Sequence, residues 1–172
     1  VCSSDLVIQD NAKVMLKNVK LAAPTTEVNT IEINGSATLL LSGTNEINGA
    51  TQGCPLTVIR GTLTINGTDN DKLTLTGENS YNAGCLGLRE GASLIINGGD
   101  IVADGSKTQH GSGIGAYWTG WNDPRYGSIT INGGKINASG GGNSAGIGSG
   151  SQCGGGDIII TGGNITATRS EE

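Results

Sequence analysis

Aromatic residues are concentrated in one stretch of this sequence. Four of the chain's five aromatic side chains fall within Ala116–Tyr126. An aromatic ring can stack against the C–H face of a sugar, while nearby polar side chains bind its hydroxyls. The stretch predicts a carbohydrate-binding site with the candidate residues Tyr117, Trp118, Trp121, Asn122, Asp123, Arg125 and Tyr126. The alternative, which the sequence leaves open, is a packing lid whose rings cover glycine-rich neighbouring segments.

Two pairs of carboxylates offer the oxygen ligands that calcium prefers. Asp69 and Asp71 form the first pair, and Asp100 and Asp104 the second, with Lys135 expected beside Asp100. All four are candidate calcium ligands. The first pair also fits a tight turn that needs no metal, and the second fits a solvated ion pair, and we favour these simpler interpretations. Calcium is therefore a possible cofactor, and no other is expected.

The cysteines and the single histidine could also carry chemistry. Cys54 and Cys85 fall at the same place in consecutive repeat units, just before a leucine. A disulfide, which suits an exported protein, and buried free thiols both fit this position. His110 is the chain's one histidine and lies in a Gly/Ser-rich segment, where we expect it to be exposed and without a catalytic role.

The elements that position these residues follow from a repeat. Two apolar residues that stand two apart, followed in most copies by Asn-Gly or Gly-Gly, recur along the chain. This period indicates a strand with one buried face, and the glycines suit a sharp turn. The copies are Thr38–Gly43, Thr62–Gly67, Ser93–Gly99, Ser128–Gly134 and Asp157–Gly163. We align Leu39 and Leu41 of the first copy with Leu63 and Ile65 of the second.

Each repeat unit contains three short strands, and successive units begin at Ile31, Leu56, Leu86, Ile114 and Ile147. None of these strands is long enough to form a stable sheet alone, but each can lie on its counterpart in the previous unit. The pattern predicts an all-β, right-handed parallel β-helix of about six coils with three short strands per coil. Ile96, Ile131 and Ile160 should then form one continuous internal row.

Composition excludes several other classes of protein. The 172 residues include 31 Gly, 3 Pro and no Phe, and the net charge is −5. Glycine does not recur at every third position, which excludes collagen. No apolar stretch approaches the roughly 20 residues of a membrane-spanning helix. The negative charge with scattered basic residues argues against nucleic acid as a partner.

The motif Ala-Gly-Ile-Gly-Ser-Gly, followed by Ile-x-Ile-x-Gly-Gly-x-Ile-x-Ala, resembles repeats in surface proteins of gut bacteria. It is also similar to the clostridial carbohydrate-binding β-helix family that recognises pectic polymers. The similarity is best over Ser93–Thr168 and implies the same architecture. Both termini resemble translated sequencing adapter, so we expect residues 1–6 and 169–172 to be artefact and residues 7–168 to be the β-helix.

These observations predict a non-catalytic extracellular or cell-surface module of a larger bacterial protein. It would bind a polysaccharide or surface glycan, or act as a stalk or adhesin, with other coils of the parent chain at both ends. No catalytic residue is predicted, because Asp157 is the single acid among the outward positions of the repeated strand. The alternative is a fragment of a polysaccharide lyase or glycoside hydrolase whose catalytic coils lie outside it.

Overall fold

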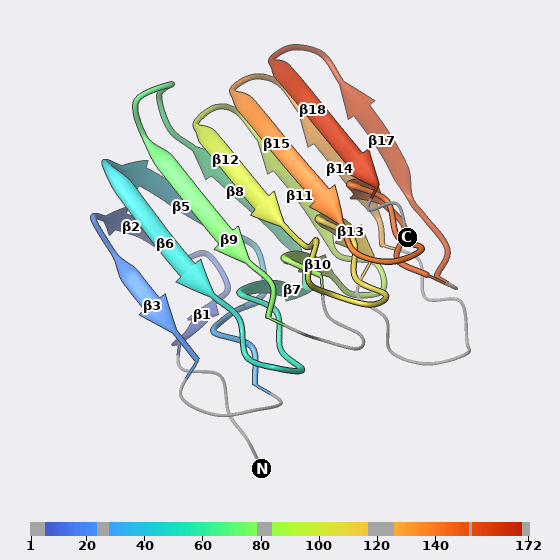
Figure 1. Cartoon of the computed structure of the whole chain (residues 1–172). Helices are drawn as coiled ribbons and strands as arrows, with labels where there is room; N and C mark the ends of the chain where they lie inside the picture. The colour runs from blue at the N-terminus through green and yellow to red at the C-terminus, as the bar shows by residue number, and fades with distance from the viewer. Residues whose placement is uncertain (1–5, 24–27, 79–83, 117–125, 152, 170–172) are drawn as a thin grey trace.

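The structure is a computed structural model that describes residues 6–23, 28–78, 84–116, 126–151 and 153–169. Within these ranges every regular element is a β-strand, and the strands form three parallel sheets of six strands each. Figure 1 shows the strands of one sheet side by side in chain order, with the other two sheets behind them. We name the sheets A, B and C in the order in which the chain visits them.

Each coil of the chain contributes one strand to each sheet, and neighbouring strands in a sheet come from successive coils. Sheet A consists of β1 (Leu6–Gln9), β4 (Ile31–Asn34), β7 (Leu56–Arg60), β10 (Leu86–Leu88), β13 (Ile114–Ala116) and β16 (Ile147–Gly148). Sheet B consists of β2 (Lys13–Lys17), β5 (Ala37–Ser42), β8 (Thr62–Asn66), β11 (Ser93–Ile96), β14 (Ser128–Ile131) and β17 (Asp157–Ile160). Sheet C consists of β3 (Lys20–Ala22), β6 (Thr44–Asn48), β9 (Lys72–Thr76), β12 (Asp100–Asp104), β15 (Lys135–Gly140) and β18 (Asn164–Arg169).

The predicted parallel β-helix with three strands per coil is therefore confirmed. Its first strand begins at Leu6 and its last ends at Arg169, one residue outside the expected β-helix boundaries at each end. No helix in the described part of the chain is long and apolar enough to cross a membrane.

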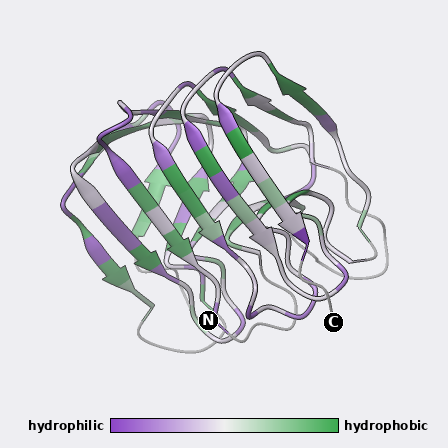
Figure 2. Cartoon of the chain, turned by 45° about the horizontal axis from the view of Figure 1, so that its top comes forward, coloured by the Kyte–Doolittle hydropathy of each residue, from purple (hydrophilic) through white to green (hydrophobic). Residues whose placement is uncertain are grey.

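The core consists of rows of apolar side chains that run from coil to coil. Ile65 pairs with Ile96, Ile96 with Ile131 and Ile131 with Ile160. The first three of these are fully buried, and the expected continuous row is confirmed. Figure 2 shows the cause, because hydrophobic and hydrophilic residues alternate along several strands. Alternate residues of a strand point to opposite faces, so one set fills the interior.

The register differs from the expected one at the second coil. Leu39 pairs with Ile65, and Ala37, instead of Leu39, pairs with Leu63. The alignment of Leu39 with Leu63 was therefore wrong by two residues. A shift of two keeps every side chain on its own face of the sheet, so the hydrophobic pattern could not reveal it.

The apolar pattern did not locate the strand β6, because only one of its two buried inward positions, Ile47, is apolar. Asn45 takes the place that Leu73 holds in the next coil, and it is fully buried. Its Oδ1 accepts a hydrogen bond from the Val19 N–H at 3.0 Å, and its Nδ2 donates to the Lys72 and Ser42 carbonyls at 3.2 and 3.4 Å. These partners compensate the loss of solvation that burial of a polar side chain entails.

The turns between sheets B and C use glycines with positive φ, among them Gly134 at +93°. A Cβ atom at Gly134 would lie 2.6 Å from the Gly99 carbonyl oxygen. One at Gly91, φ +71°, in the turn between β10 of sheet A and β11 of sheet B, would have no atom within 4 Å. Gly91 therefore lacks the steric constraint of the neighbouring coil, although both positions disfavour a side chain.

We expect Gly134→Ala to lower the free energy of unfolding by about 2–4 kcal/mol and Gly91→Ala by about 1 kcal/mol. Both substitutions strain the backbone, but the first also pushes two coils apart. Urea unfolding followed by far-ultraviolet circular dichroism measures the difference. Equal losses in the two variants would contradict the close packing of coils at this turn.

Candidate functional site

Most of the expected aromatic site lies outside the described residues. This applies to Tyr117, Trp118, Trp121, Asn122, Asp123 and Arg125. The stretch follows β13 in sheet A and precedes β14 in sheet B. The assignment of a sugar-binding or lid role to these six residues stays a prediction.

Tyr126 is described, and it is not an exposed sugar platform. Its side chain is 3% exposed and belongs to the hydrophobic core cluster. The ring lies over the next coil, since a Cβ at Gly156 would come within 2.8 Å of Cδ2. Burial raises the pKa of the Tyr126 hydroxyl. Tyr126 therefore packs into the core, and its part in sugar binding stays a prediction.

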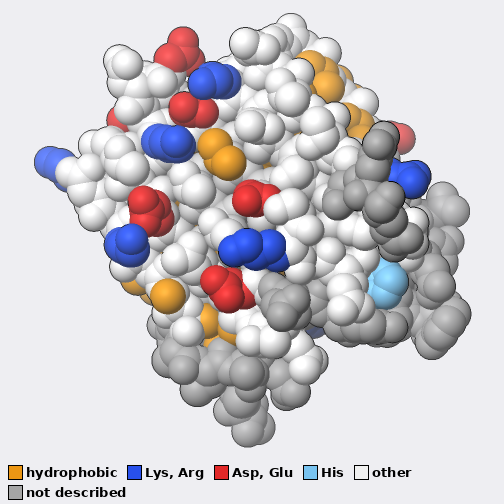
Figure 3. Space-filling model, in the orientation of Figure 1, with side chains coloured by type: hydrophobic (Ala, Val, Ile, Leu, Met, Phe, Trp, Pro, Cys, Tyr) orange, Lys and Arg blue, Asp and Glu red, His pale blue; other side chains and the backbone are white. Residues whose placement is uncertain are grey.

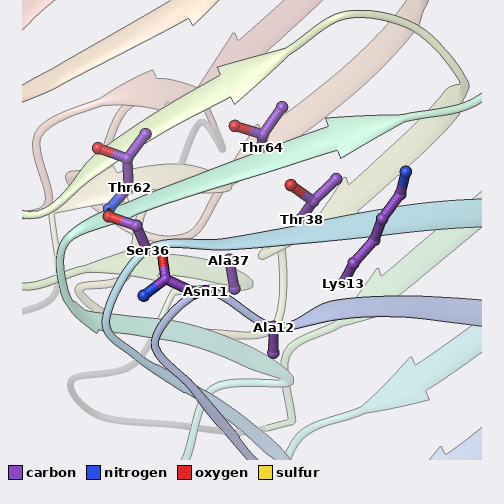
Figure 4. A pocket seen from close by; sticks show the side chains of 8 residues that line it. All are labelled: Asn11, Ala12, Lys13, Ser36, Ala37, Thr38, Thr62 and Thr64. Atoms are coloured by element: carbon purple, nitrogen blue, oxygen red, sulfur yellow. Dashed lines mark hydrogen bonds between the residues drawn. The ribbon is translucent and has the colours of Figure 1, made fainter.

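A hollow of about 360 Å³ lies on the outer face of sheet B, across the first three coils. Figure 4 shows Lys13, Thr38 and Thr64 side by side on neighbouring strands. We name it the sheet B hollow, and the residues that line it are Asn11, Ala12, Lys13, Ser36, Ala37, Thr38, Thr62 and Thr64.

Two features of the first coils lie beside the sheet B hollow. Ala12 and Ala37 precede Leu63 in the same inward row, so their small side chains belong to the core side of the sheet. The sheet A ladder is also irregular just before this point, where Asn34 pairs with Arg60.

Polar groups around the sheet B hollow are partly held in place by backbone contacts. The Ser36 Oγ accepts a hydrogen bond from the Thr62 N–H at 3.2 Å, and the Ser36 N–H donates to Asp10 Oδ1 at 2.7 Å. Hydroxyl groups both donate and accept, and Lys13 adds a positive charge. A volume of this size matches small-ligand sites, and the chemistry suits a polyhydroxylated ligand.

A ladder of polar side chains continues along the same face of sheet B. Asn97 Nδ2 donates to Asn66 Oδ1 at 2.9 Å, and Asn132 Nδ2 donates to Asn97 Oδ1 at 2.8 Å. The Thr161 hydroxyl donates to Asn132 Oδ1 at 2.8 Å and extends the ladder to the last coil. These amides bond to one another, which identifies them as a structural feature of the turns.

The first calcium candidate pair forms the expected tight turn. The Asp71 N–H donates to the Thr68 carbonyl at 2.9 Å. Asp71 Oδ1 accepts from the Gly43 N–H at 2.8 Å, and Oδ2 accepts from the Thr68 N–H and hydroxyl at 2.9 and 2.6 Å. These bonds, the Thr68 hydroxyl first, lower the pKa of Asp71. Asp69 is exposed in the turn.

Replacement of Asp71 should change how stability depends on pH. Because its folded pKa lies below the ordinary value, the carboxylate stabilises the fold above its unfolded pKa, and this contribution disappears as the pH falls through the folded pKa. Asp71→Asn should therefore be less stable than the parent chain near pH 6, and the difference should shrink toward pH 2. Urea midpoints across this range measure it. A difference that does not vary with pH would contradict the role of the charge.

The second calcium candidate pair does not form one site. Asp100 and Asp104 stand four residues apart on β12, which separates them by about 13 Å along a strand. One calcium ion binds its oxygens at about 2.3–2.6 Å, so it cannot hold both. Asp104 instead accepts from the Ser106 hydroxyl and N–H and from the Ser139 hydroxyl, which lowers its pKa.

Asp100 lies in a mixed-charge outer face of sheet C. It pairs along the ladder with Lys135, as expected, and their charged atoms are 3.8 Å apart. Lys20 and Glu46 form a second ion pair at 2.8 Å, which lowers the pKa of Glu46. Figure 3 shows acidic and basic side chains interspersed on this face. Exposed pairs of this kind contribute little to stability.

Cys54 and Cys85 form no disulfide in this structure. Cys54 and Cys85 are both fully buried, which raises the pKa of the Cys54 thiol to about 12 and also raises the pKa of the Cys85 thiol. Of the two alternatives, the structure has the buried thiols and not the disulfide. His110 is half-buried and not fully exposed, and its carbonyl accepts from the Ser151 N–H at 3.2 Å.

Within the described ranges, no three His, Cys, Asp or Glu side chains lie close enough to hold a metal ion. Fold and surface together define the class of protein as a parallel β-helix, or β-solenoid, with a polar hollow on one sheet. The chain matches no protein-family model, no curated protein and no solved structure.

Proposed function

We propose that this chain is a non-catalytic stalk module of a larger bacterial surface protein. The observation that carries the proposal is the regular stack of coils, in which three parallel ladders join each coil of the described residues to the next. At the last coil, the inward residues Ile158 and Ile160 are 43% and 51% exposed. Terminal repeats of a solenoid usually carry a polar outer face, so these exposed apolar side chains form an edge on which another coil could stack. The extracellular location rests on the resemblance to surface-protein repeats.

A stalk must resist extension, and this can be measured by pulling on the chain through handles at its two ends. We expect the force to rise to a peak before the stack opens. The chain should then lengthen by about 3.5 Å for each residue that unfolds. The physical reason is that strands within the stack must lose several backbone hydrogen bonds together. A chain that lengthens steadily without a force peak would contradict the proposed role.

A second candidate function, glycan binding, is supported by the sheet B hollow. Its lining combines hydroxyls, an amide and one lysine, which suits a sugar and favours an acidic one such as a uronate. The aromatic stretch 117–125 is a separate candidate, and both tryptophans of the chain lie in it. The two candidates can therefore be tested independently.

A panel of pectin, xylan and mucin glycans tests glycan binding by calorimetry and by tryptophan fluorescence. Thr38→Leu fills the sheet B hollow. Thr130→Leu is the matched control, because Thr130 lies in the same row of outward side chains but two coils beyond the last coil of the hollow. We expect Thr38→Leu to abolish binding at the hollow and Thr130→Leu to leave it intact. A fluorescence change that survives Thr38→Leu would assign binding to the aromatic stretch. Absence of binding across the panel would contradict a glycan role, and release of new sugar ends would contradict a non-catalytic one.

A further inference from the structure

The two open ends of the β-helix are complementary to each other. Each end presents three strands that lack a neighbour on one side, β1, β2 and β3 at the first coil and β16, β17 and β18 at the last. An unpaired strand edge is a template for pairing with another chain. We propose that the last coil of one molecule stacks on the first coil of a second copy, so that isolated chains associate head to tail.

The inward rows continue across such a contact. If the ladder of sheet B keeps its register, Ile160 faces Val14 of the next copy, because both belong to the row that contains Leu39 and Ile131. Likewise Ile158 faces Ala12. The large Ile158 would stand opposite a small side chain, so the two ends fit without a clash at that position.

Sheet C continues in the same way. Its row of Leu73, Ile101 and Ile136 ends at Ile165, and its counterpart in the first coil is Val19. Both are partly buried at present and pack against the core from opposite ends. Stacking would remove these apolar side chains from water, which is the main source of favourable free energy in association.

Backbone donors and acceptors at the two ends also match. Between the last two coils, the Ile131 carbonyl accepts a hydrogen bond from the Thr161 N–H at 2.8 Å. In a parallel ladder, adjacent residues of a strand point their N–H and C=O groups to opposite sides, so those of Ile160 point to the free edge. At the other end, the Ala12 carbonyl faces the second coil, where it accepts from the Thr38 N–H at 2.9 Å.

The N–H groups of Lys13 and Met15 therefore point away from the second coil. In the extended register, the Met15 N–H meets the Ile160 carbonyl, which repeats the bond between Thr161 and Ile131. The side chains at this end are also compatible in charge, because Asp157 would lie diagonally across from Lys13. The contact thus reproduces the coil-to-coil interface that the chain already makes within itself.

Sedimentation of the 172-residue chain over a range of concentrations tests the proposal. Proline removes a backbone N–H and is tolerated where that N–H faces solvent. Met15→Pro blocks the first coil and Ile160→Pro blocks the last, and circular dichroism confirms that each variant stays folded. We expect the parent chain to grow beyond a dimer, and each variant alone to stay monomeric.

An equimolar mixture of the two variants gives the sharpest result. Each variant retains the end that the other lacks, so the mixture should form dimers and nothing larger. Ile95→Lys, which changes the outer face in the middle of the stack, should associate like the parent. If a proline variant unfolds, Ile160→Lys with Val14→Lys replaces the pair. A monomeric parent chain, variants that associate like the parent, or a mixture without dimers would overturn the proposal.

This inference goes beyond the stalk role and does not depend on it. A chain that stays monomeric could still resist extension, and a chain that associates could still lengthen without a force peak. The pulling experiment therefore tests the stalk role alone, and the sedimentation experiment tests the association alone.

Discussion

Replacing Ile96 with Ala is expected to lower the free energy of unfolding by about 2–5 kcal/mol. Ile96 is fully buried in the middle of its row, with Ile65 below it and Ile131 above it. The truncated side chain leaves a cavity that neither neighbouring coil can fill, since each is held by its own ladder. Urea unfolding at equilibrium, followed by circular dichroism, measures the loss.

Ile160→Ala is the matched control, because it makes the same change in the same row at the last coil. Ile160 is 51% exposed, so the substitution removes little buried surface and should cost less than about 1 kcal/mol. The measurement is made on a dilute chain, in which the ends are free. Equal costs at the two positions would show that Ile96 is not enclosed by neighbouring coils.

Replacing Asn45 with Leu is expected to destabilise the chain by about 2–4 kcal/mol, although Leu occupies the same row position in the next coil. The substitution leaves the Val19 N–H and the Lys72 carbonyl without their side-chain partner. A buried polar group that loses its partner costs about 1–3 kcal/mol. The same unfolding experiment measures the effect.

Asn137→Leu provides the comparison for this prediction. Asn137 lies on the outer side of sheet C and is exposed, so its replacement should change stability by no more than about 0.5 kcal/mol. A stabilising effect of Asn45→Leu would contradict the hydrogen-bonding role of Asn45 and favour simple completion of the apolar row.

Most of the fold was predictable because each coil repeats the same inward pattern. The pairs Leu94 and Ile96, Ile129 and Ile131 align without any shift, and the structure pairs them as expected. A period of two, with glycines after it, leaves few alternatives once a strand is too short to stand alone. The first coils were harder, since Asn45 interrupts the pattern and a two-residue shift preserves it.

The candidate site was less predictable, because a site depends on what surrounds a side chain. The sequence showed that Tyr126 is aromatic, but only the packing against Gly156 shows that its ring is buried. The separation of Asp100 from Asp104 follows from the strand between them, and it excludes the shared calcium ion. The sheet B hollow is lined by residues from three coils, so no local sequence motif predicts it.

The central claim is that apolar side chains of successive coils lie directly over one another. Methyl-labelled isoleucine tests this in solution, through nuclear Overhauser contacts between side chains. Coils are spaced about 4.8 Å apart, so the structure predicts an unbroken series of contacts from Ile65 through Ile96 and Ile131 to Ile160. A series that skips one of these residues would contradict the stacked-coil fold. Contacts of Ile96 with the outer-face residues that surround Ile95 would contradict it as well.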